Sequence, residues 1–159
     1  MPEPLEQEGW QIIDEFNRAL AHPTATAIFC VRGGYGALRL LPHLDYDAAR
    51  RHPKLLVGYS DITALHLALW EKARLPGLSG PMVAVEWDAM DALSESLFWH
   101  LARGGTGAVV GPGGEALAGV RDGQVEGVLL GGNLSLVARL IGTPYLPDLT
   151  GAILFLEEV

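Results

Sequence analysis

Apolar side chains at helical spacing mark the first element of the chain. Between residues 5 and 20 they recur at steps of three and four, as Trp10, Ile13, Phe16 and Leu20. Residues at this spacing share one face of a 3.6-residue helix, while the polar side chains between them face water. The pattern therefore predicts an amphipathic helix over 5–20, which ends before Pro23.

Farther along, short apolar runs alternate with helical patterns. The runs that predict strands are 26–31, 54–58 and part of 77–84. The segments that predict helices are 37–41, 46–53, 62–73 and 88–103. This alternation is typical of an α/β fold with a parallel sheet, in which sites form at the carboxyl ends of the strands.

After residue 103 the pattern changes, because glycines and turn-forming residues dominate 104–124. The elements expected beyond it are a strand and turn in 125–133, a helix in 134–142 and a strand in 151–159. A turn-rich stretch between two apolar regions indicates a domain boundary. The resulting division is a first domain over 1–106, a linker over 107–124 and the beginning of a second domain over 125–159.

Composition narrows the class of protein. Apolar residues make up 49% of the chain and charged residues 19%, which is enough apolar material for a core. The net charge of −8 disfavours binding to nucleic acid or to an anionic membrane. The sequence lacks a signal-peptide pattern and an apolar run of about 18 residues. Because Cys30 is the single cysteine, no internal disulfide can form, and we expect a reducing, cytoplasmic setting.

A serine lies where a predicted strand meets a predicted helix, in the segment LLVGYSDITALH. In a nucleophile elbow, a tight turn of this kind lifts the hydroxyl clear of the backbone. Gly58 lies two residues before Ser60, as in G-x-S-x-G, but Ile62 occupies the position of the second glycine. Taken alone, the pattern favours an ordinary helix cap over a nucleophile.

The loop RGGYG, residues 32–36, follows the first predicted strand. Consecutive glycines allow a ligand to approach the backbone closely, so Gly33 and Gly34 could supply amides to an oxyanion or simply form a tight turn. Arg32 could pair with a substrate carboxylate or make a structural salt bridge. The chain contains no nucleotide-binding glycine motif.

The histidines do not supply an obvious base or metal site. They are His22, His43, His52, His66 and His100. Their scatter does not match metal-ligand spacing, so we expect neither a metal nor a cofactor. Six helical residues separate His66 from Ser60, a rise of about 9 Å that is too long for a direct hydrogen bond. The residues alone therefore leave the base for Ser60 unassigned.

Five blocks, in order, resemble the LD-carboxypeptidases, the serine peptidases of family S66. The blocks are CVRGGYGALRLLPHLDY, PKLLVGYSDITALH, LSGPMVA, EGVLLGGNLSLVARLIGTPYLPD and ILFLEEV. The resemblance implies a Rossmann-like N-terminal domain with a parallel sheet, followed by the start of a β-rich C-terminal domain. It also implies that a first strand–helix segment and most of the C-terminal domain lie outside these 159 residues.

Such enzymes use a Ser-Glu-His triad, and the resemblance assigns its serine to Ser60 and its glutamate to Glu157. The histidine belongs to a later block that the sequence does not reach. The oxyanion amides would be those of Asp61 and of the Gly33–Gly34 pair. Glu158 is the alternative to Glu157 as the triad glutamate. Adjacent strand residues point to opposite faces, so a one-residue error in the assignment would move the carboxylate to the other face of the strand. Asn133, after an expected tight turn at Gly131 and Gly132, could cap the next helix or touch substrate, and we favour the cap.

The implied activity is that of a cytoplasmic serine carboxypeptidase without metal or cofactor. It would release the terminal D-alanine of a murein tetrapeptide through an acyl-enzyme. Within the family, the alternative is an immunity peptidase of the microcin type that acts on a modified aminoacyl-nucleotide. A third hypothesis is a non-catalytic fragment that binds a small ligand or a partner. Because the histidine is absent, we expect the 159-residue chain alone to have little or no peptidase activity.

The expected partners are a muropeptide or another small peptide and a second copy of the chain, in a homodimer. If both ends are short, they expose apolar surface and unpaired strand edges, which promote self-association. Sedimentation velocity should therefore show oligomers at high concentration. A monodisperse monomer under those conditions would contradict this prediction.

Overall fold

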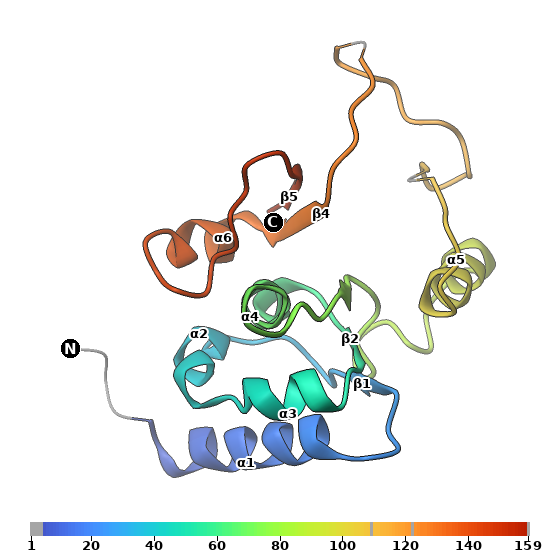
Figure 1. The fold of residues 1–159 in the computed structure, drawn as a ribbon. Coiled ribbons are helices and arrows are strands. Elements are labelled where there is room, and N and C mark those ends of the chain that lie inside the picture. The colour runs from blue at the N-terminus through green and yellow to red at the C-terminus, as the bar shows by residue number, and fades with distance from the viewer. Residues whose placement is uncertain (1–4, 109, 122, 159) are drawn as a thin grey trace.

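The computed structural model describes residues 5–108, 110–121 and 123–158, and none of the helices in these ranges is long and apolar enough to cross a membrane. The fold is α/β, with a parallel sheet in the order β1-β2-β3 and a separate parallel pair β4-β5 (Figure 1). The strands are β1 (Ala27–Phe29), β2 (Leu55–Val57), β3 (Gly77–Leu78), β4 (Leu129–Asn133) and β5 (Ile153–Glu157). The helices are α1 (Gln7–Ala21), α2 (Ala37–Leu40), α3 (Tyr46–Arg51), α4 (Thr63–Ala73), α5 (Ala92–Ala102) and α6 (Leu134–Leu140), with the 3₁₀ turns η1 (Leu41–His43) and η2 (Ser60–Ile62).

The predicted helices are all present, and the α/β class with parallel strands is confirmed. The largest shift is at α5, which begins at Ala92 rather than at 88 because the residues before it form turns. Asp91 defines that start, since its carboxylate accepts a hydrogen bond from the Ser94 amide at 2.9 Å.

Side chains pack on both faces of the three-stranded sheet. Successive strand residues point to opposite sides, so Leu56 joins the core against the helices while Val57 faces the other way. On that second side, Phe98 of α5 makes edge-to-face contact with Phe29 of β1. Phe98 of α5 therefore covers part of the sheet face opposite the main core.

Helix α4 is the centre of the molecule. It packs against α3, α6 and β4, and in Figure 1 it lies between α3 and α6. Because neighbours surround it, α4 is apolar on most sides rather than along one stripe. Its fully buried side chains are Thr63, Ala64, Leu65, Leu67, Ala68 and Leu69.

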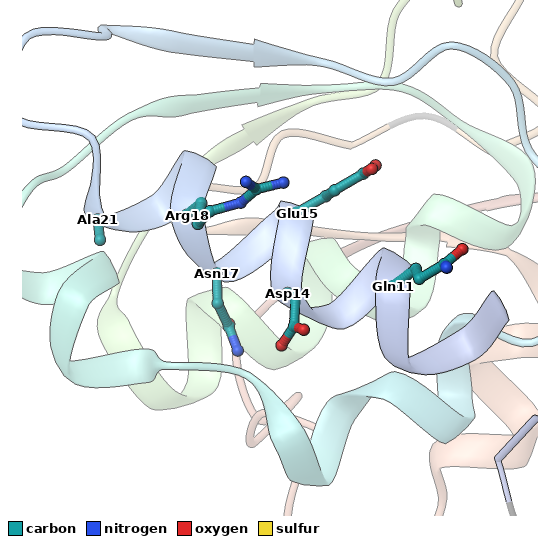
Figure 2. A pocket seen from close by; sticks show the side chains of 6 residues that line it. All are labelled: Gln11, Asp14, Glu15, Asn17, Arg18 and Ala21. Atoms are coloured by element: carbon teal, nitrogen blue, oxygen red, sulfur yellow. The ribbon is translucent and has the colours of Figure 1, made fainter. Parts of the chain in front are cut away.

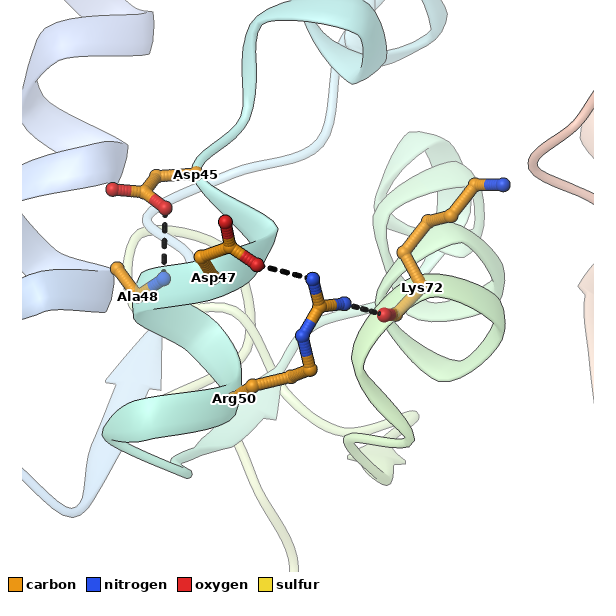
Figure 3. A network of polar contacts seen from close by, with 5 residues as sticks. All are labelled: Asp45, Asp47, Ala48, Arg50 and Lys72. Atoms are coloured by element: carbon orange, nitrogen blue, oxygen red, sulfur yellow. Dashed lines mark hydrogen bonds and ion pairs between the residues drawn. The ribbon is translucent and has the colours of Figure 1, made fainter.

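A polar network fixes α3 against the end of α4 (Figure 3). Asp45 caps α3 by accepting a hydrogen bond from the Ala48 amide at 2.7 Å. Arg50 pairs with Asp47 on the same helix and also donates to the Lys72 carbonyl in the last turn of α4. This arginine therefore satisfies one of the terminal carbonyls that a helix leaves without an internal partner.

Two glycines of β4 allow close packing, Gly131 against β5 and Gly132 against the first turn of α4. The expectation of a tight turn at Gly131 and Gly132 is wrong, because both belong to β4. A Cβ at Gly131 would lie 1.8 Å from the Phe155 carbonyl oxygen, and a Cβ at Gly132 would lie 2.4 Å from Thr63 Oγ1. Gly131 thus serves close approach to the β5 backbone and Gly132 close approach to the Thr63 side chain, and neither serves chain reversal.

Thr63 makes the central polar contact of this junction, because its buried hydroxyl accepts a hydrogen bond from the Asn133 amide at 2.9 Å. Thr63→Val keeps the shape and leaves that amide without an acceptor. We expect the free energy of unfolding to fall by about 1–3 kcal/mol, measured by urea denaturation. The exposed Thr24 provides the control, and Thr24→Val should change stability little. Equal effects of the two variants would contradict the role of the Thr63 hydroxyl.

Candidate active site

Ser60 has an unusual backbone conformation, with a φ of 60°. Within the described ranges, Arg74 at the end of α4 is the other non-glycine residue with a positive φ. The left-handed region costs an L-residue roughly 1–2 kcal/mol. Ser60 lies three residues after the end of β2 and begins the helical turn η2, and its side chain is half-buried. The structure therefore has the strained strand-to-helix turn that a nucleophile elbow requires.

Gly58 makes this tight turn sterically possible. A Cβ at this position would lie 3.1 Å from both the Cys30 Cβ and the Ile62 Cγ1. The Gly58 amide donates to the Leu78 carbonyl of β3 at 3.2 Å, which continues the sheet pairing up to the turn. Any larger residue would push the turn away from β1.

The side chain of Asp61 joins the serine turn to the glycine loop. Its carboxylate accepts a hydrogen bond from the Ala37 amide at 2.9 Å, at the start of α2. Burial raises the pKa of Asp61, while the Ala37 amide and the charge of Arg139 act in the opposite direction. The sequence analysis assigned a role only to the backbone amide of Asp61. The hydrogen bond of its carboxylate to Ala37 is seen only in the structure.

The glycine loop lies against the serine. A Cβ at Gly33 would be 3.4 Å from the Ser60 Cβ, 3.5 Å from its Oγ and 3.6 Å from the Met82 Cε. Gly34 has a φ of 152°, and a Cβ there would meet no atom within 4 Å. Of the two glycines, Gly33 is thus the one in contact with Ser60. Arg32 is exposed and makes no ion pair with another residue in the described part of the chain.

Glu157 ends β5 beside Asn133, its partner in the β4-β5 register. Since the Asn133 amide binds Thr63, this end of the second sheet lies at the first turn of α4, close to the turn of Ser60. The charge of Glu157 also contributes to raising the pKa of Tyr59, the residue before Ser60. Among the described residues, no hydrogen bond joins the Ser60 and Glu157 side chains.

Glu158 has a different environment from Glu157. Its carboxylate accepts hydrogen bonds from the Ser135 amide at 2.9 Å, the Ser135 hydroxyl at 2.7 Å and the Asn133 side-chain amide at 3.2 Å. Asn133 itself caps α6, because its Oδ1 accepts from the Leu136 amide at 3.2 Å. Glu158 and Asn133 therefore stabilise the start of α6 together.

Tyr59 and Glu86 were not singled out from the sequence. The Tyr59 hydroxyl donates to the Glu86 carboxylate, which also accepts from the Met82 amide at 3.1 Å. This bond to Glu86 is the main cause that raises the pKa of Tyr59, followed by burial and by the charges of Glu86 and Glu157. No motif marks Glu86, since it lies 27 residues from Tyr59 and meets it only in the folded chain.

Ser60 does not line either of two hollows on the described part of the surface. One, of about 540 Å³, lies on α1 (Figure 2) and is lined by Gln11, Asp14, Glu15, Asn17, Arg18 and Ala21. The other, of about 370 Å³, lies between α4 and the β4-β5 pair and is lined in part by His66, Trp70 and Phe155. Neither includes a residue that the sequence assigns to catalysis. Within the described ranges, no three His, Cys, Asp or Glu side chains gather as metal ligands would.

The left-handed serine, the apposed glycine loop and the carboxylate at the end of β5 all belong to a parallel α/β fold. Residues 5–80 match the LD-carboxypeptidase N-terminal domain, and residues 126–159 match the LD-carboxypeptidase C-terminal domain. The chain belongs to the LD-carboxypeptidase family.

Individual relatives agree with this assignment. The Bacillus subtilis protein named "Probable murein peptide carboxypeptidase" is 35% identical over 84% of this chain and 42% of its own length. The murein tetrapeptide carboxypeptidase of Pseudomonas aeruginosa is 32% identical over 94% of this chain and 50% of its own length. The microcin C7 self-immunity protein MccF of Escherichia coli is 31% identical over 91% of this chain and 50% of its own length. The chain thus spans about half the length of these relatives.

Solved structures give the same result. An MccF-like protein from Bacillus anthracis is 28% identical, with a TM-score of 0.79 over 94% of this chain and 52% of that one. MccF in complex with glutamyl sulfamoyl guanosine is 26% identical, with a TM-score of 0.73 over 92% of this chain and 52% of the MccF chain. The fold therefore matches the family at the level of three-dimensional structure.

The strain at Ser60 has a measurable consequence for stability. Glycine adopts a φ of 60° without steric cost, whereas alanine does not. Ser60→Gly should therefore be more stable than Ser60→Ala by about 1 kcal/mol in chemical denaturation. At the exposed helical position Ser96 the order should reverse, because glycine destabilises a helix relative to alanine. The same order at both positions would contradict a strained Ser60.

Proposed function

We propose that this protein is a serine carboxypeptidase that hydrolyses the L,D-peptide bond to the terminal D-alanine of a murein tetrapeptide, in cytoplasmic peptidoglycan recycling. The observation that carries the proposal is the left-handed Ser60 at the strand-to-helix turn, apposed to Gly33, in a chain of the LD-carboxypeptidase family. The murein tetrapeptide carboxypeptidase among its relatives supports the choice of substrate.

In the proposed reaction, the Ser60 hydroxyl attacks the carbonyl of the scissile bond. The bond to D-alanine breaks, an acyl-enzyme forms, and water then releases the shortened peptide. The tetrahedral intermediate carries a negative oxygen, which needs amide donors. We assign these donors to Asp61, at the start of the helical segment that continues into α4, and to the Gly33–Gly34 pair. The contact of Gly33 with Ser60 and the positive end of that helical segment support this assignment.

Glu157 is our candidate for the acid of the triad. It would orient the histidine that, in the family pattern, follows it in the chain, and would stabilise the imidazolium. Two observations favour Glu157 over Glu158. The charge of Glu157 acts on Tyr59 beside the nucleophile, whereas Glu158 is occupied with capping α6.

In this proposal, Arg32 binds the terminal carboxylate of the substrate. Its exposed guanidinium on the glycine loop is free of ion pairs with other described residues and suits a terminal carboxylate. Asn133 is a weaker candidate, because both ends of its side-chain amide already bind Leu136 and Glu158.

The test measures release of D-alanine from murein tetrapeptide by the whole protein and by three variants. Ser60→Ala should lower kcat by at least about 10³-fold, because it removes the nucleophile. Glu157→Gln should lower kcat by about 10²-fold or more, because the histidine loses its orienting charge. Glu158→Gln is the matched control, and it should affect stability more than kcat.

Unchanged D-alanine release by Ser60→Ala would overturn the proposal. A loss with Glu158→Gln instead of Glu157→Gln would transfer the acid to Glu158. Robust, Ser60-dependent turnover by the 159-residue chain alone would require one of its own histidines to act as the base.

A second candidate is an immunity peptidase of the microcin type. The observation that favours it is the likeness to MccF, which has been solved with glutamyl sulfamoyl guanosine. Such an activity would use the same Ser60 on an aminoacyl-nucleotide analogue. Comparing kcat/KM for murein tetrapeptide and for glutamyl sulfamoyl guanosine separates the two functions.

A further inference from the structure

His66 contacts the serine turn from the second turn of α4. Its Nε2 lies 2.9 Å from the Gly58 carbonyl oxygen, two residues before Ser60. A carbonyl oxygen can only accept a hydrogen bond, so Nε2 must carry the proton. The contact therefore fixes both the tautomer and the ring orientation of His66.

The other ring nitrogen is enclosed. Nδ1 of His66 is buried and has no hydrogen-bond partner among the described residues. Gly77, at the start of β3, lies directly over it, since a Cβ at this position would be 1.8 Å from Nδ1. Burial lowers the pKa of His66, which favours the neutral ring. The imidazole is thus held between β3 and the serine turn.

The buried surroundings of the His66 ring would favour an apolar side chain over histidine, apart from the contact of Nε2 with the Gly58 carbonyl. A buried nitrogen without a partner costs free energy that a leucine of similar size would avoid. The bond from Nε2 to Gly58 is the one polar interaction of the ring that the structure describes. What His66 contributes here is therefore a donor aimed at the Gly58 carbonyl.

Gly58 is consequently fixed on both of its backbone polar groups. Its amide donates to Leu78 at 3.2 Å, and its carbonyl accepts from His66. On the far side of Ser60, the Asp61 carboxylate binds the Ala37 amide. A strained conformation persists only where the surrounding structure determines it on both sides.

We propose that His66 is a positioning residue for Ser60: its Nε2–H, bonded to the Gly58 carbonyl, holds the serine turn in the left-handed conformation that presents the hydroxyl for attack. The inference rests on the proposed function of Ser60 as nucleophile. His66 does not act as the base, because Nε2 is bonded to Gly58 and Nδ1 is covered by Gly77.

The first test compares His66→Leu, which removes the donor, with His66→Gln, whose terminal amide reaches about as far as Nε2. In the whole protein, His66→Leu should lower kcat for D-alanine release by 10- to 100-fold and leave KM within about 3-fold, because the substrate contacts are intact. His66→Gln should restore most of kcat. The exposed His22 is the control, and His22→Leu should change neither constant.

The second test does not depend on activity. If His66 maintains the strain, the stability advantage of Ser60→Gly over Ser60→Ala should disappear in the His66→Leu background and remain in His66→Gln. If His66→Leu fails to fold, His66→Asn replaces it, because its amide is one carbon too short to reach Gly58.

The outcomes separate the two proposals. If the unmodified protein shows no Ser60-dependent release of D-alanine, the proposed function fails and the stability comparison alone decides the role of His66. His66 is not a positioning residue if the variants that lack the donor keep both kcat and the higher stability of Ser60→Gly over Ser60→Ala. The same conclusion follows if kcat and KM change together and His66→Gln does not restore them.

Discussion

The candidate site depends on one constraint: Gly58 and Asp61, on either side of Ser60, are anchored by hydrogen bonds, and Ser60 between them takes a left-handed conformation. Gly58 is bonded through its amide and its carbonyl, and Asp61 holds the start of α2 through its carboxylate. The anchors come from β3, α4 and α2, which are separate elements of the first sheet and its helices. The strain at Ser60 is thus a property of the assembled α/β unit rather than of the local sequence.

The candidate site also depends on the junction between the two sheets. Thr63 bonds the Asn133 amide, and Gly132 allows β4 to approach α4 closely. Through the β4-β5 register, this junction determines where the carboxylate of Glu157 lies. Tyr59 is then flanked by two acids, Glu86 and Glu157, both of which disfavour its ionisation. The electrostatic environment of the serine turn therefore combines charges from both halves of the chain.

Much of the fold follows from local patterns. Helices α1 and α4 are predicted by apolar spacing, and the placement of Ser60 at a strand-to-helix joint follows from the run before it. Gly131 and Gly132 were misassigned, because a glycine needed for close approach looks the same in sequence as one needed for a turn. The Tyr59–Glu86 and His66–Gly58 contacts had no signal of their own, since each depends on a side chain that meets its partner only after packing.

The junction at Thr63 also bears on the order of folding. Its hydrogen bond to Asn133 closes a loop of 70 residues, whereas the helix turns around Ser60 are local. Long loops are slow to close, and the N-terminal part of a chain leaves the ribosome first. During synthesis, the serine turn can therefore form while β5 is still unmade, and the carboxylate at the end of that strand joins the turn later.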